Sequence, residues 1–69
     1  MDTHAILTHR LRQLADEKGW SLNRLADFAG ISRGSMSTLM GPKGNPTLRT
    51  MEKIAKALEV EAPDLLRRD

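Results

Sequence analysis

The residues from Ser32 to Met40, SRGSMSTLM, combine one arginine, four hydroxyl side chains and a glycine. An arginine can donate paired hydrogen bonds to a guanine base, and a hydroxyl group both donates and accepts hydrogen bonds. A glycine lets the backbone approach a ligand closely. Glycine and serine also lower helix propensity, whereas a merely solvated helix would favour glutamate, lysine and alanine. The stretch is therefore typical of a short helix whose outer face serves polar recognition.

Other residues that could perform chemistry are not arranged for it. His4 and His9 are five positions apart and lack a third ligand nearby, and no histidine or acid is placed to activate the serines around Arg33. The loop GPKGNP, residues 41–46, lacks the Gly-Lys-Ser/Thr ending of a phosphate-binding loop. The chain has no cysteine, which excludes disulfides and thiolate metal sites. We therefore expect no enzymatic activity, no metal, no cofactor and no small-molecule substrate.

Hydrophobic residues recur every three or four positions along the chain, which predicts helices and no strand. The first helix would run from about Thr3 to Lys18, with Gly19 as a left-handed stop after it. The residues expected to face the core are Leu7, Leu11, Leu14 and Ala15, then Leu22, Leu25, Ala26 and Ala29, then Met36, Leu39 and Met40, then Leu48, Met51, Ile54, Ala55 and Leu58.

Hydroxyl residues mark where the next three helices begin. The expected N-caps are Ser21, Ser32 and Thr47. Gly30 would end the second helix, and the proline- and glycine-rich loop 41–46 would end the third. Pro63 would take the first position of a short fifth helix, PDLLRR, residues 63–68. A chain of 69 residues forms one domain, so we predict a single all-α domain over 1–69, a compact five-helix fold.

Positive charge gathers in the middle of the chain. The whole sequence has a net charge of +2. Between Trp20 and Met51, four basic residues face the single acid Asp27, a net charge of +3, and the remainder is slightly acidic. No apolar run is long enough to span a membrane. The absence of cysteine suits a reducing cytoplasm, and the basic centre suits an anionic partner.

The second and third helices have the layout of a helix-turn-helix over about residues 21–40. Ala26 lies where a larger side chain would collide with a crossing helix, and Gly30 lies where the chain must turn within about three residues. In this motif the first helix lies across the DNA backbone and the second enters the major groove. The residues of this second helix that do not face the core form its outer face, with Ser35 at the edge. The expected base contacts are Arg33, Gly34, Ser37 and Thr38.

These residues resemble the lambda-repressor-like (XRE/Cro-type) helix-turn-helix family. The similarity runs from about Leu11 to Leu66 and is carried by SLNRLADFAGIS, Met36, Leu39 and NPTLRTMEKIAKALEV. The resemblance implies a bacterial or phage transcriptional regulator, a repressor bound to a palindromic operator in the nucleoid, and often a dimer. It places Arg33, Gly34 and Thr38 where relatives contact bases. Leu22 stands where many relatives carry a phosphate-binding glutamine.

A wider set of residues is expected to contact DNA phosphates. The start of the second helix offers backbone amide hydrogens even without the glutamine. The loop 41–46 and the start of the fourth helix flank the recognition helix. The phosphate contacts that we predict are Ser21, Leu22, Asn23, Ser35, Lys43, Asn45, Thr47 and Arg49.

One recognition helix touches only a few base pairs, which is too little contact to find one site in a genome. If the chain ends at Asp69, a homodimer has to form through the domain itself. The residues expected at that interface are Val60, Pro63, Leu65 and Leu66, unless they only cap the core of a monomer. The alternative function is an antitoxin or protein-interaction adaptor with the same fold. A recognition face rich in large apolar residues would have favoured it.

Overall fold

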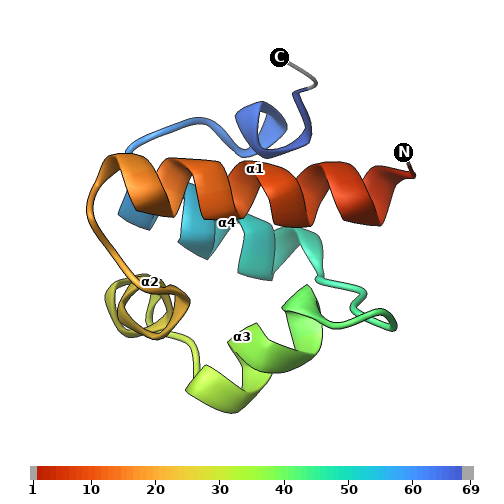
Figure 1. Ribbon diagram of the computed structural model, residues 1–69, viewed down its shortest axis with the longest axis horizontal. Helices are drawn as coiled ribbons and strands as arrows, with labels where there is room; N and C mark the ends of the chain where they lie inside the picture. Colours follow the sequence, from red (N-terminus) through yellow and green to blue (C-terminus); the bar gives the residue numbers. More distant parts are fainter. Residues whose placement is uncertain (1, 68–69) are drawn as a thin grey trace.

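The computed structural model describes residues 2–67, and within that range it contains four α-helices, one 3-10 helix and no strand. The elements in chain order are α1 (Thr3–Glu17), α2 (Leu22–Ala29), α3 (Arg33–Met40), α4 (Leu48–Leu58) and the 3-10 helix η1 (Ala62–Leu66). Figure 1 shows α1 crossing in front of α4, with η1 on one side of this pair and α2 and α3 on the other. The helix α3 therefore lies at the edge of the molecule opposite η1. No helix in the described part of the chain is long and apolar enough to cross a membrane.

Local signals set where the helices begin and end, as predicted. The three expected caps each accept a hydrogen bond from a backbone N–H three residues later, at 3.0–3.1 Å: Ser21, Ser32 and Thr47. Gly19 and Gly30 adopt the left-handed conformation, with φ of 72° and 75°. The start of α1 has a cap that the sequence analysis did not assign, because the Asp2 carboxylate accepts from the backbone N–H of Ala5 at 2.8 Å.

The core is built from the predicted apolar stripes. Leu11, Leu25 and Ile54 are completely buried at its centre, and α4 packs against both α2 and η1. One assignment is wrong, because Leu48 is 68% exposed. Helical spacing identifies the face on which Leu48 lies, but its position at the very start of α4 leaves it at the rim of a surface groove with Val60 and Pro63.

The last helix also differs from the prediction. It is a 3-10 helix that begins at Ala62, so Pro63 occupies the second position and not the first. The helix starts earlier because the Asp64 carboxylate accepts a hydrogen bond from the backbone N–H of Glu61 at 3.1 Å, which caps it before the proline. Arg67 is already extended, with φ −75° and ψ 145°. The predicted continuation to Arg68 lies outside the described residues.

Candidate nucleic-acid interface

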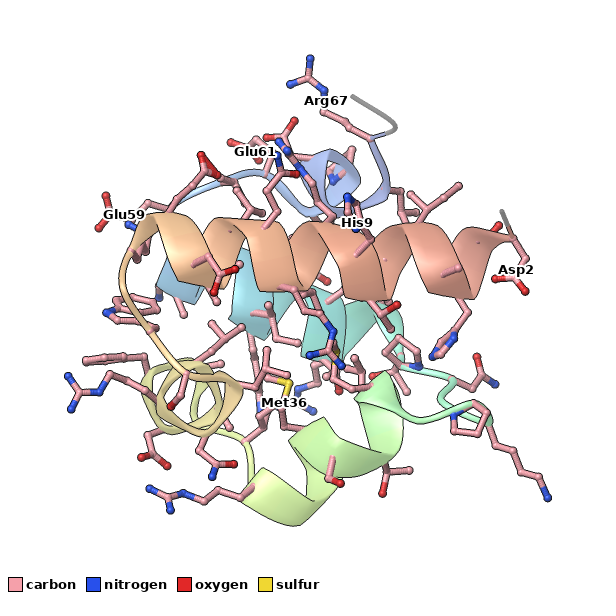
Figure 2. The ribbon with its side chains drawn as sticks, viewed as in Figure 1. Asp2, His9, Met36, Glu59, Glu61 and Arg67 are labelled. Carbon is pink, nitrogen blue, oxygen red and sulfur yellow. The ribbon has the colours of Figure 1, made fainter. Side chains whose placement is uncertain are left out.

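The four predicted base-contact residues lie on the exposed side of α3. Arg33, Gly34, Ser37 and Thr38 are exposed, whereas Met36 and Leu39 of the same helix are buried. Figure 2 shows Met36 pointing from α3 into the molecule. The helix α3 packs mainly against α2, so its polar side is left uncovered. Because eight residues of weak helix propensity would not hold a helix alone, this packing is what maintains it.

One flank of α3 borders a groove toward the start of α4. The groove brings Gly34 and Thr38 of α3 close to Asn45 and Thr47, two of the predicted phosphate contacts. Ser35, also predicted to contact phosphate, lies on the same side. The complete lining is Ser32, Gly34, Ser35, Thr38, Leu39, Asn45, Pro46, Thr47 and Thr50.

The other flank of α3 borders a second groove, toward α1 and α2. Here Ser37 faces Leu22 and Asn23, so predicted base and phosphate contacts again lie together. Arg12 of α1 lines this groove too, and it also borders a neighbouring hollow beside Ser21. No role was predicted for Arg12 from the sequence. Its only sequence signal is a basic residue on the polar side of α1, and packing of α1 against α2 is what places it beside Leu22.

The remaining predicted phosphate contacts are Lys43 and Arg49, which are exposed and line neither groove. Neither side chain forms a salt bridge with any residue in the range 2–67. The acids Glu59 and Glu61 lie on the side of the molecule away from α3 (Figure 2). Two of the acids outside the basic centre of the sequence therefore lie away from the predicted base contacts (Figure 2).

Arg33 is held by an acid at the end of the preceding helix. Its Nη2 donates to Oδ2 of Asp27 at 3.0 Å, and its Nε donates to Oδ1 at 3.4 Å. The hydrogen bonds from the guanidinium hold the pKa of the Asp27 carboxyl below its usual value, and the carboxylate in turn raises the pKa of Arg33. Because both side chains are more than half exposed, the pair adds little to stability. It does connect α2 to the first residue of α3.

The other end of α3 is held by α1. His4 Nε2 donates a hydrogen bond to the backbone carbonyl of Leu39 at 2.9 Å; a carbonyl only accepts, so the proton is on Nε2. Gly44 lies so close to the same carbonyl that a side chain there would overlap it. The loop 41–46, which carries Lys43 and Asn45, is therefore fixed against the end of α3.

The residues predicted at a dimer interface separate into two groups. Leu65 is completely buried in the core of the chain, so it has no surface with which to contact a second copy. Pro63 is exposed, Val60 is partly buried, and Leu66 is 38% exposed. A groove between α4 and η1 brings Val60 and Pro63 together with the exposed Leu48.

This arrangement of helices and the exposed polar face of α3 define a helix-turn-helix domain. The chain belongs to the family of Cro/C1-type helix-turn-helix DNA-binding domains, whose model matches residues 10–69. This result confirms the family resemblance and the all-helical fold class inferred from the sequence.

Several regulators and one solved structure are similar to the chain. The HTH-type transcriptional regulator SutR of Escherichia coli K12 is 39% identical over 54 residues, which cover 78% of this chain and 30% of SutR. SinR of Bacillus subtilis 168 is 32% identical over 62 residues, which cover 88% of this chain and 56% of SinR. The chain thus spans about half, or less, of these curated relatives. The crystal structure of the hypothetical transcription factor NHTF from Neisseria matches with a TM-score of 0.88 and 36% identity, over 96% of this chain and 76% of that one.

Proposed function

We propose that this chain binds duplex DNA sequence-specifically, with α3 in the major groove, and represses transcription in the bacterial cytoplasm without catalysis. The observation that carries the proposal is the exposed polar face of α3 between two grooves that gather candidate phosphate contacts on both flanks. A helix held in a major groove needs such flanking contacts, because phosphate contacts fix the register while base contacts select the sequence. The membership of the Cro/C1-type family supports the same function.

Each exposed residue of α3 has a chemistry that suits a base edge. Arg33 can donate to guanine, the hydroxyls of Ser37 and Thr38 can pair with several bases, and the Thr38 methyl group can contact a thymine methyl. Gly34 leaves open space in front of the helix, since a Cβ built there would have no neighbour closer than 4.0 Å. The proposed phosphate contacts are Ser21, Leu22 and Asn23 through the start of α2, together with Ser35, Lys43, Asn45, Thr47 and Arg49.

Selection of bound sequences from a random duplex library tests the proposal. We expect enrichment of one motif, with the arrangement of its half-sites visible in the selected sequences. Arg33→Ala should cost about 1–3 kcal/mol on that motif and relax the preference at one base pair, whereas Lys43→Ala should weaken all duplexes about equally. Selection without enrichment would refute sequence-specific binding and would favour an adaptor or antitoxin that binds a protein.

A homodimer on a palindromic operator completes the proposal. The surface that supports it is the groove formed by Leu48, Val60 and Pro63, where an exposed leucine adjoins two other apolar side chains. Burial of this surface against its copy removes apolar area from water. Two recognition helices about 34 Å apart would match one turn of DNA.

Sedimentation with and without a palindromic duplex tests the dimer. We expect two chains per palindrome at saturation. Leu48→Ser should weaken the second binding event. Phe28→Ser, a change at an exposed apolar residue of α2 whose ring stacks on Trp20, should not. One chain per palindrome at saturation would rule the dimer out.

A further inference from the structure

The guanidinium of Arg33 has two hydrogen-bonding edges, and Asp27 occupies one of them, so the other edge remains for a ligand. An arginine has five N–H donors arranged in a plane. The Asp27 carboxylate occupies the side formed by Nε and Nη2, at 3.4 and 3.0 Å. The edge formed by Nη1 and the second hydrogen of Nη2 remains available. That edge presents two parallel donors, which is the pattern that O6 and N7 of guanine accept.

The position of Asp27 in the charge distribution also calls for an explanation. It is the single acid between Trp20 and Met51, and it lies beside the first residue of α3 and within electrostatic range of Arg24. A negative charge at this place repels DNA phosphates and lowers the affinity for every sequence. The pair is also exposed, with 56% of the Asp27 side chain and 62% of the Arg33 side chain accessible, so stability gives little reason for it.

We propose that Asp27 is a specificity-determining residue that holds Arg33 in position for a guanine at the DNA site. The inference rests on the proposed DNA-binding function and deepens it. The carboxylate fixes the orientation of a long side chain before DNA arrives, so less conformational freedom is lost on binding. It also neutralises much of the charge of Arg33, which removes a non-specific attraction to phosphates. Asp27 therefore lowers affinity for random DNA and raises discrimination at one base pair.

The test compares Asp27→Asn with Glu59→Gln. Both changes remove one exposed carboxylate and nearly preserve side-chain shape, but Glu59 lies on the side away from α3 (Figure 2). Dissociation constants are measured by fluorescence anisotropy for three duplexes: the selected site, the same site with the base pair controlled by Arg33 replaced, and a random sequence. Circular dichroism melts check that each variant is folded.

We expect the wild type to prefer guanine at that base pair by about 5- to 150-fold, the range of a bidentate arginine contact. Asp27→Asn should reduce that preference by about threefold or more, with affinity for the random duplex equal to or above that of the wild type. Other base pairs and the Glu59→Gln variant should keep the wild-type preference. In an Arg33→Ala background, Asp27→Asn should no longer change the preference.

Three results would overturn the inference. The first is an equal gain in affinity for all three duplexes in Asp27→Asn, which would show that Asp27 acts only by repelling DNA phosphates. The second is a persistent change in preference in the Arg33→Ala background, which would show that Asp27 acts without Arg33. The third is a selected motif without guanine at that base pair. Failure of the proposed function looks different, because the wild type would then show no preference for any motif.

Discussion

Replacing Gly44 with alanine tests how tightly the loop 41–46 is held against the end of α3. Gly44 does not have a positive φ, so any effect is steric. The added Cβ would overlap the backbone carbonyl of Leu39, which cannot turn aside, and would lie 2.8 Å from His4 Nε2. Ordinary contacts begin at 3.4 Å, so the His4 ring would have to withdraw by at least 0.6 Å (3.4 minus 2.8). That movement would disrupt its 2.9 Å hydrogen bond to Leu39.

The cost of this change follows from two contributions. Overpacking costs about 1–3 kcal/mol, and loss of the hydrogen bond adds about 0.5–1.5 kcal/mol. For a domain of this size each kcal/mol lowers Tm by about 4–8 °C, so we expect a decrease of about 6 °C or more. The assay is thermal unfolding followed by circular dichroism. Gly41→Ala is the matched control, because a Cβ at Gly41 meets Thr38 O at an ordinary 3.4 Å. Equal Tm values for the two variants would refute the close approach.

Raising the salt concentration from about 50 to 200 mM should weaken DNA binding by orders of magnitude if several phosphates are contacted, and an unchanged anisotropy titration would contradict a cationic binding face. Arg12→Gln should weaken binding to all duplexes about equally, because Arg12 lines the groove beside Asn23, and an unchanged affinity would contradict that role. Gly30→Val should destabilise the domain by about 1–3 kcal/mol, since a β-branched residue resists the φ of 75° at this position. A Tm equal to that of the wild type would contradict it.

The boundaries of the helices could be predicted because their signals are local. A hydroxyl cap acts on a backbone N–H only three residues away, and Gly30 takes its conformation within a single turn. The end of α4 shows where such rules fail. Glu59 adopts φ 61° there without being a glycine, so no sequence signal marked that stop. Burial was harder to predict at Leu48, because a periodic pattern does not say which turns a neighbouring helix covers.

The contacts that position α3 could not be predicted, because they join residues that are not related by helical spacing. His4 and Leu39 are 35 residues apart, and a lone histidine near the start of a helix has no property that predicts its partner. Asp27 and Arg33 are six residues apart, but they meet only because the left-handed turn at Gly30 places the start of α3 beside the end of α2. The exposed face of α3 could be predicted from the sequence, whereas the contacts that hold this face in place are visible only in the tertiary structure.

The weak helix propensity of α3 is tolerated because contacts with the rest of the domain stabilise the helix. Gly34 alone costs about 1 kcal/mol relative to alanine in a helix. The buried side chains of Met36 and Leu39 each contribute about 1.5–3 kcal/mol, which exceeds that cost. Asp27 and His4 then orient the two ends of the helix. Stability thus comes mainly from the inward side chains, which leaves Ser37 and Thr38 available for contacts with DNA bases. Substitutions at these two exposed positions should therefore change sequence preference with little change in Tm.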